Sequence, residues 1–306
     1  MRVYYSDQHP VPLPSTHRFP MEKYRRVREQ LLSQRVLLPS QMQPADLAPL
    51  DALARVHSPD YLSAIFDGTL TPAEERKLGF PWSPELVVRS RASVGGTLAA
   101  ARSALADGLS GNLAGGTHHA FADHGEGYCV FNDIAVAIRA LQADGEIDRA
   151  VVVDLDVHQG NGTAQIFEGD DTVFTFSMHG EHNFPFRKTR SCRDVGLPDG
   201  TGDAAYLDAL LRHLPEVLES AGADVLFYQA GVDPLAEDSL GRLSLSLDGL
   251  LERDRIVLQL AWSRGLPTVL TLGGGYARPI ERSVEAHVGT YQTAVRIAGD
   301  PVRAAR

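Results

Sequence analysis

The sequence predicts an α/β fold in which a central parallel β-sheet is flanked by helices on both faces. Two observations predict this fold class. Short runs typical of strands alternate with longer helical runs along the chain, and this alternation favours a parallel sheet covered by helices. Polar residues and glycines follow most of the expected strands, which is where open parallel sheets place their ligands.

The expected strands are Arg2–Tyr5, Gly111–Ala114, Ala150–Asp154, Thr172–Met178, Asp224–Ala230 and Pro267–Leu272. The expected helices are Met21–Gln34, Pro84–Asp107, Asp133–Asp144, Asp203–Ala221, Asp248–Ser263 and Pro279–Ile297. One helix begins with Pro84, whose missing N–H is harmless at a helix start. Another opens on the acidic Asp203 and ends before Gly222, both of which are typical of helix ends.

The chain is expected to form one domain over residues 1–306. The Pro-rich segments His9–Pro20 and Pro39–Pro49 are expected to be loops that cover one end of the sheet. We find no internal repeat, low-complexity stretch or long linker that would divide the chain. A single α/β domain can run to about 250 residues or more, so the length permits one domain with a large core.

Composition limits the function classes. Hydrophobic residues make up 43% and charged residues 22%, as in ordinary globular proteins, and the net charge is −10. This acidity argues against a nucleic-acid partner and is compatible with a cationic substrate or peptide. The two cysteines, Cys129 and Cys192, are too few for a disulfide framework. No signal peptide and no apolar stretch of the ~18 residues that a membrane helix needs is visible, so we expect a cytoplasmic protein without membrane contact.

The segment Val151–Gly162 carries the strongest local signal. Its apolar β-branched residues lead into Asp154, Asp156 and His158, and the chain then turns on glycines. In an extended chain, residues i and i+2 point to the same side, so Asp156 and His158 can aim at a common point. With a third donor from elsewhere, they would form an open catalytic zinc site. The alternative interpretation is an ordinary solvated strand end.

Further polar residues follow the neighbouring strands. Because the carboxyl ends of parallel strands share one edge, these side chains are expected to converge with the Asp156 pair. The set comprises His118, His119, Asp156, His158, Asp233 and Tyr276. The adjacent histidines are hard to explain by packing, since burial would demand hydrogen-bond partners for both. Gly273–Gly275 lacks the following Lys-Ser/Thr of a phosphate loop, which argues against a nucleotide.

This set of residues suits amide hydrolysis. A zinc ion held by Asp156, His158 and Asp233 would polarise a substrate carbonyl and acidify a water molecule. One of the paired histidines would take the water proton and later protonate the leaving amine. Tyr276 would donate its hydroxyl proton to the developing oxyanion, while Asp154 is better placed to orient a histidine.

Nucleophilic serine or cysteine chemistry is less well supported. The sequence contains no Gly-x-Ser-x-Gly elbow. Cys129 lies in an apolar run without a flanking cation that would lower its pKa, so we expect it to be structural.

Five motifs together resemble the zinc-dependent histone deacetylase family. They are Gly-Gly-Thr-His-His-Ala (115–120), Gly-Tyr-Cys-Val-Phe-Asn-Asp (127–133), Asp-Leu-Asp-Val-His-Gln-Gly-Asn-Gly (154–162), Gly-Val-Asp-Pro-Leu-Ala-Glu-Asp-Ser-Leu-Gly (231–241) and Leu-Gly-Gly-Gly-Tyr (272–276). Their order and spacing match the family over nearly the whole chain. Two further segments, His-Arg-Phe-Pro-Met-Glu-Lys-Tyr (17–24) and Asn-Phe-Pro-Phe-Arg-Lys (183–188), resemble its bacterial branch near class IV. The resemblance implies an arginase/deacetylase fold, one catalytic domain and removal of acyl groups from lysine side chains.

The resemblance also implies roles for individual residues. Zinc, with iron(II) as the alternative, would be bound by Asp156, His158 and Asp233. His119 would be the general base, His118 its electrostatic or acid partner, and Tyr276 the residue that polarises the carbonyl. The acyl-lysine tunnel would be lined by Gly127, Tyr128, Phe186 and Gly274. A structural potassium ion would be held by Asp154, Asp156, His158, Ser177 and Met178.

One position departs from part of the family. Some members carry Asp where this chain has Asn161, and that Asp would hydrogen-bond the base. A neutral amide stabilises an imidazolium less than a carboxylate does, so we expect a lower pKa for His119 here. Position 276 is Tyr and not the His of a weakly active branch, so turnover is expected.

Two alternative functions remain at this stage. An acetylpolyamine amidohydrolase would share the core and the site, but it usually carries an inserted loop for which this chain has no obvious room. A non-catalytic acyl-lysine-binding module is the alternative from another class, and the intact catalytic set argues against it. The segments 9–20, 71–84 and 181–195 are expected to shape the rim of the site. The motifs do not fix the acyl-chain length, the oligomeric state or the native metal.

Overall fold

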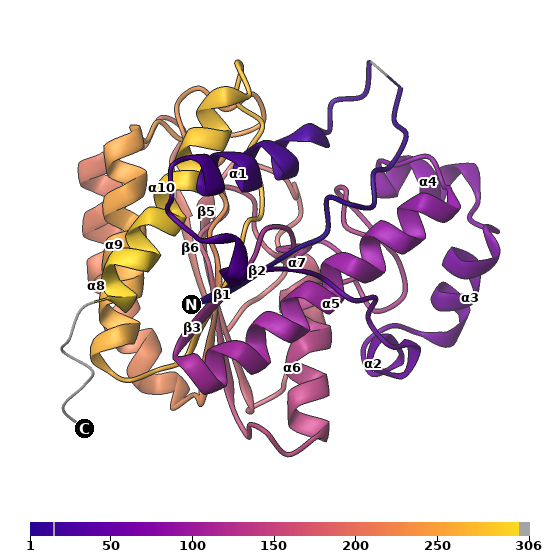
Figure 1. Ribbon diagram of the computed structural model, residues 1–306, viewed down its shortest axis with the longest axis horizontal. Helices are drawn as coiled ribbons and strands as arrows, with labels where there is room; N and C mark the ends of the chain where they lie inside the picture. Colours follow the sequence, from indigo (N-terminus) through magenta and orange to yellow (C-terminus); the bar gives the residue numbers. More distant parts are fainter. Residues whose placement is uncertain (15, 300–306) are drawn as a thin grey trace.

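The computed structural model describes residues 1–14 and 16–299 (Figure 1). Over these residues, eight strands form one parallel sheet in the order β2-β1-β3-β8-β7-β4-β5-β6. The strands are β1 (Arg2–Tyr5), β2 (Met42–Pro44), β3 (Leu109–Asn112), β4 (Ala150–Asp154), β5 (Val173–Gly180), β6 (Arg193–Leu197), β7 (Val225–Gln229) and β8 (Thr268–Thr271). The predicted fold class is thus confirmed.

The main helices lie in two groups on opposite faces of the sheet (Figure 1). One face is covered by α1 (Glu22–Ser33), α8 (Asp203–Ala221), α9 (Leu247–Ser263) and α10 (Glu281–Ala298). The other is covered by α5 (Pro84–Asp107) and α6 (Asp133–Ala143), with α2 (Leu50–Ala54), α3 (Pro59–Asp67) and α4 (Pro72–Leu78) further out. The short helices η1 (Pro39–Gln41) and α7 (Asn161–Ile166) lie in connections between strands and helices.

The apolar run of β4 is buried on both faces. Val151 and Val153 belong to the hydrophobic cluster beneath α8, α9 and α10, whereas Ala150 and Val152 belong to the cluster beneath α5 and α6. Successive side chains of a strand point to opposite faces, so a strand between two helical layers needs apolar residues at every position. This requirement explains why the sequence shows no polar alternation here.

Parts of the chain differ from the expectation. The prediction that residues 39–49 form a loop is wrong, because Met42–Pro44 pairs with Val3–Tyr5 as edge strand β2. Within 71–84, helix α4 is fixed by a capping box at Thr71 and ends at Gly79, which has a φ of 83°. The strand expected at 111–114 lies two residues earlier, as β3.

The sheet brings four strand ends together. Asp154, at the end of β4, is in register with Gln229 of β7 and Ser177 of β5, and Gln229 pairs with Thr271 of β8. The loops after these strands therefore start from neighbouring points, as ligand sites at the carboxyl edge of a parallel sheet require.

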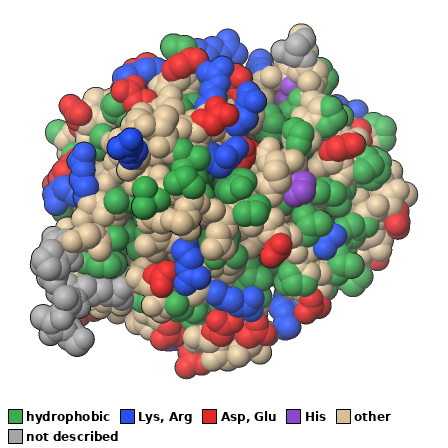
Figure 2. All heavy atoms as spheres, in the orientation of Figure 1, with side chains coloured by type: hydrophobic (Ala, Val, Ile, Leu, Met, Phe, Trp, Pro, Cys, Tyr) green, Lys and Arg blue, Asp and Glu red, His purple; other side chains and the backbone are tan. Residues whose placement is uncertain are grey.

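Within the described ranges, no helix combines the length and hydropathy needed to span a membrane. On the face shown in Figure 2, acidic and basic side chains are interspersed.

Candidate active site

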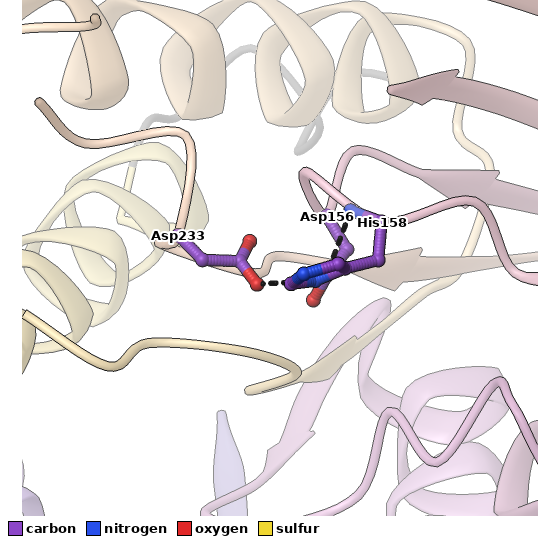
Figure 3. A group of neighbouring side chains, drawn as sticks. All are labelled: Asp156, His158 and Asp233. Carbon is purple, nitrogen blue, oxygen red and sulfur yellow. Dashed lines mark hydrogen bonds and ion pairs between the residues drawn. The ribbon is translucent and has the colours of Figure 1, made fainter. Parts of the chain in front are cut away.

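Two loops form a compact acidic group at this edge of the sheet (Figure 3). Asp156 and His158 follow β4, and Asp233 faces them from the loop after β7. The Nδ1 atom of His158 lies 3.0 Å from Asp156 Oδ1 and 3.0 Å from Asp233 Oδ2. One potential ligand atom from each residue lies within 4.8 Å of the others, and all three side chains are buried.

The protein backbone orients both carboxylates. Asp156 Oδ2 accepts a hydrogen bond from the Gly274 N–H at 2.7 Å, and Asp233 Oδ1 accepts one from the Val157 N–H at 2.8 Å. The other oxygen of each carboxylate faces His158. These fixed partners leave the inward-facing oxygens as a preformed donor set.

The charges of this group fit a divalent cation. Burial, reinforced by the charge of Asp156, raises the pKa of Asp233 to about 7. Burial alone would lower the pKa of His158, but hydrogen bonds to the two carboxylates outweigh it and raise that pKa to about 10. Two carboxylates in a dry site thus attract a proton onto the imidazole, and a metal ion can take its place. Two oxygens and one imidazole nitrogen match a catalytic zinc site with an open position.

The two adjacent histidines have different partners. His118 Nδ1 lies 2.7 Å from Asp154 Oδ2, and His119 Nδ1 lies 2.6 Å from Asn161 Oδ1, while their ring centroids are 4.0 Å apart. Burial lowers the pKa of His118, but the charges of the nearby aspartates outweigh it and raise the net value. For His119, burial and the neighbouring histidines hold the pKa well below its usual range. His119 is therefore the neutral ring of the pair.

A buried aspartate outside the predicted set anchors the histidine loop. Asp133, at the start of α6, accepts hydrogen bonds from the backbone N–H groups of Gly116 and Thr117 at 3.1 and 2.7 Å. Gly116 has a φ of 75°, and a Cβ there would lie 2.7 Å from the Cα of Gly273. This close approach brings the histidine loop against the loop that carries Tyr276.

Tyr276 lies on the opposite side of the pocket, and a buried lysine fixes its loop. Lys23, which is not among the predicted site residues, donates from Nζ to the carbonyls of Gly273 and Gly275, each at 3.3 Å. The Tyr276 N–H donates to Asp238 Oδ2 at 2.6 Å, so Asp238 braces this loop as well as the Asp233 loop. Burial raises the pKa of Tyr276 well above its usual range, which keeps its hydroxyl protonated.

All six convergent residues line one pocket of about 550 Å³. Tyr128 forms part of its wall and has a φ of 67°, a conformation that is strained for a non-glycine residue. The preceding Gly127 must lack a side chain, because a Cβ would lie 2.7 Å from the His119 ring. This turn thus places the Tyr128 ring on the pocket wall and the Gly127 backbone against the His119 ring.

Two phenylalanines of the segment after β5, Phe184 and Phe186, line the pocket. Phe186 is predicted to line the tunnel, but its side chain is 85% exposed and it lies at the outer part of the pocket. Phe184 packs edge-to-face on the His119 ring, with the centroids 4.9 Å apart, and Phe186 packs on Phe184. The aromatic residue beside the base is therefore Phe184, two residues earlier in the Phe-Pro-Phe motif.

The residues assigned to a potassium site also lie together. Ser177 of β5 is in register with Asp154 of β4, and Ser177 and Met178 are buried beside the Asp156 loop. The neighbouring His179 is buried and lies 2.9 Å from the Ser177 hydroxyl.

Lys188, in the segment expected to shape the rim, donates to the carbonyls of Asn183 and Pro185.

Comparison with known proteins identifies the class. Residues 17–291 match the histone deacetylase domain family. An uncharacterized protein of Picosynechococcus sp. is 47% identical over 285 residues, covering 93% of this chain and 95% of that protein. Histone deacetylase 2 of Arabidopsis thaliana is 32% identical over 284 residues, covering 88% and 73%. A crystal structure of an HDAC homologue complexed with SAHA superposes with a TM-score of 0.81 at 25% identity, covering 97% and 84%.

The fold and the site define a hydrolase of the arginase/deacetylase class that acts on amide bonds. The chain belongs to the histone deacetylase family. The predicted family, fold and enzyme class are confirmed, and the family supports a metal cofactor at the Asp156 group.

Gly274 should tolerate no side chain. A Cβ there would lie 1.9 Å from Asp233 Oδ2 and 2.9 Å from Asp156 Oδ2. We expect Gly274→Ala to displace Asp233 and to weaken binding of a divalent metal ion, probed with zinc, by roughly 10–100-fold, as for lost ligand orientation. Zinc affinity is measured by competition with a chelating dye. In the control Gly196→Ala, the new Cβ would be 3.6 Å from its nearest neighbour, and affinity should not change.

Proposed function

We propose that this protein is a zinc-dependent deacylase that removes acetyl or longer acyl groups from lysine side chains of proteins or peptides. One observation carries the proposal: a single pocket with aromatic walls is lined by the donor set, the His119 imidazole and Tyr276. An extended acyl-lysine side chain suits such a pocket, because its methylenes contact the aromatic rings and its amide reaches the polar end.

In the proposed reaction, Asp156, His158 and Asp233 would hold a zinc ion, which when bound would polarise the acyl carbonyl and acidify a water molecule. His119 Nε2 takes a proton from that water as its oxygen bonds to the carbonyl carbon. Tyr276 donates a hydrogen bond to the oxygen that gains negative charge. The carbon–nitrogen bond then breaks, the amine nitrogen receives a proton from a histidine, and a carboxylate and a free lysine amine result.

Further assignments belong to the same proposal. We propose that Asp154 keeps His118 protonated, so that His118 stabilises negative charge near the reacting atoms. The potassium site is proposed at Asp154, Asp156, His158, Ser177 and Met178. Zinc is preferred to iron(II) as the native metal because tetrahedral sites with nitrogen and oxygen donors suit zinc. Both cysteines are free, which fits our proposal of a cytoplasmic location.

The charges that line the pocket disfavour a polyamine substrate. Arg76, Lys77 and Arg242 line the pocket, and Glu126 is the carboxylate outside the metal group that does so. A cationic acetylpolyamine would meet like charges on entry, which slows association. A peptide carries its acyl-lysine without that excess of positive charge.

A substrate panel tests this proposal. We expect zinc-loaded protein to hydrolyse acyl-lysine peptides, from acetyl to myristoyl, with kcat/KM at least about 10-fold above that for acetylspermidine, since each ~1.4 kcal/mol of discrimination gives a factor of ten. The measurement is release of free amine at equal zinc loading. A preference for acetylspermidine would replace the substrate class, and binding of acyl-lysine peptides without turnover of any acyl amide would favour a binding module.

A further inference from the structure

We infer that Glu126 is a positioning residue for the general base: it sets the orientation of the Asn161 amide and thereby the tautomer of His119. The inference rests on the proposed function, because it assigns His119 as the base. It concerns a residue outside the five sequence motifs. The evidence is a chain of two hydrogen bonds from His119 through Asn161 to Glu126.

The first bond requires one orientation of the amide. A side-chain amide offers one oxygen acceptor and one nitrogen that only donates. The Asn161 oxygen lies 2.6 Å from His119 Nδ1, so Nδ1 carries the proton and donates it. The Nε2 atom of His119 then keeps its lone pair. The opposite orientation would present N–H groups to Nδ1, moving the ring proton to Nε2 and removing the base.

The second bond selects that orientation. Asn161 Nδ2 lies 3.4 Å from Glu126 Oε2, so the carboxylate accepts from the amide nitrogen. If the amide turned over, its oxygen would face the carboxylate, and the two would repel each other. A carboxylate can only accept, so Glu126 discriminates between the two orientations in a way that a neutral amide could not.

Hydrogen bonds fix the backbone of Glu126. It begins a tight turn in which its N–H donates to the Cys129 carbonyl and its carbonyl accepts from the Cys129 N–H, at 3.2 and 2.9 Å. The two central residues of this turn, Gly127 and Tyr128, both have positive φ, as such turns require. Their N–H groups also bond to the end of α4, at the carbonyls of Lys77 and Leu78. One strained turn thus positions the ring of Tyr128 and the carboxylate of Glu126.

The Glu126 carboxylate forms no ion pair with a described residue. Over residues 1–14 and 16–299, no lysine, arginine or histidine forms an ion pair with its carboxylate, although Arg76, Lys77 and Arg242 line the same pocket. Its side-chain hydrogen bond is the one to Asn161. The Glu126 carboxylate is therefore available to the Asn161 amide.

A double-mutant cycle with Asn161 tests the inference. Glu126→Gln keeps the shape but removes the discrimination, since a glutamine can accept or donate, and we expect kcat to fall roughly 10-fold with KM unchanged. In the Asn161→Asp background the prediction reverses. The introduced aspartate would face the Glu126 carboxylate as a like charge, whereas a glutamine in place of Glu126 can donate to it. Glu126→Gln should therefore raise kcat relative to Asn161→Asp alone.

This reversal of sign separates orientation of the base from a general packing role. A packing role predicts that Glu126→Gln has the same effect in both backgrounds, and that result, or an unchanged kcat in the single variant, would overturn the inference. Glu219→Gln, an exposed charge change on α8, is the control and should match the unsubstituted protein. The assays use whichever acyl amide the unsubstituted protein cleaves best, so absence of turnover in that protein counts against the proposed function instead.

A second measurement does not depend on activity. In metal-free protein labelled with ¹⁵N in the histidine rings, His119 of the unsubstituted chain should show a protonated Nδ1 and an unprotonated Nε2. Glu126→Ala should shift part of the population to the other tautomer. Identical ring ¹⁵N shifts in the two proteins would refute the positioning role, even if Asn161→Asp failed to fold.

Discussion

Asp233→Asn is expected to abolish turnover by removing the metal ion while preserving the fold. Asparagine can keep an oxygen at the position that accepts from the Val157 N–H at 2.8 Å. An NH₂ group then replaces the oxygen that faces His158, and the negative charge of the side chain is lost. The site then has one carboxylate instead of two, and an amide nitrogen does not bind zinc. Losing the hydrogen-bond partner of a metal ligand lowers metal affinity by roughly 10–100-fold. Losing the ligand itself should lower zinc affinity by more than that.

Metal content and turnover should fall together in this variant. Zinc is measured by atomic absorption after dialysis, turnover by amine release, and the fold by thermal unfolding. Asp208→Asn, which breaks an exposed ion pair with Arg212 on α8, should retain full zinc content and activity. If Asp233→Asn kept one equivalent of zinc at unchanged affinity, Asp233 would not be a ligand and the donor set would need revision.

Tyr276→Phe is expected to lower kcat by roughly 10²–10³-fold, the usual effect of losing one oxyanion donor. The Tyr276 hydroxyl faces the pocket without a hydrogen bond to any described residue, so its removal leaves no buried group without a partner. The backbone bond to Asp238 and the ring contacts with Phe19 and Tyr128 do not involve the hydroxyl. Stability and zinc affinity should therefore be unchanged.

The effect should appear in kcat and not in KM, because the hydrogen bond strengthens only as negative charge develops on the carbonyl oxygen. Steady-state kinetics on one acyl-lysine peptide separates the two constants. The control Tyr5→Phe changes a hydroxyl on β1 and should leave both unchanged. A rise in KM with constant kcat would assign Tyr276 to ground-state binding and remove it from the proposed chemistry.

The central part of the sheet is predictable from the sequence because the burial of β4 on both faces requires an uninterrupted apolar run. Val151 and Val153 face one helical layer and Ala150 and Val152 the other, so the run is apolar throughout. The convergence of the polar residues that follow these strands rests on one rule, that parallel strands end at a common edge. An unbroken apolar run and the common direction of the strands were sufficient for both predictions.

The edges of the fold could not be predicted in this way. Strand β2 has three residues, and β6 alternates between half-buried and exposed positions without a strong apolar signal, as in Arg193 and Asp194. Both strands are defined by pairing with a distant neighbour, and no local pattern records that pairing. Helix α4 does have a readable signal in Thr71-Pro-Ala-Glu74, a capping box with Pro at its start, from which the helix could have been predicted.

The differences within the site have a similar cause. Choosing between Phe184 and Phe186 requires the path of the loop between β5 and β6, since both rings belong to one short motif. Lys23 and Glu126 act on loops far away in the sequence, and a single sequence carries no signal for such contacts. Asn161 is recognisable from the sequence as a neutral partner of the base, but the carboxylate beyond it is visible only from the hydrogen-bond geometry.

Zinc titration of metal-free protein, followed by turnover of an acyl-lysine peptide, tests the central claim most directly. We predict that metal-free protein is inactive and that activity rises with added zinc and reaches its plateau at one equivalent bound, because one donor set holds one catalytic ion. Full activity without metal, or one equivalent of bound zinc without turnover of any acyl-lysine peptide, would contradict the claim.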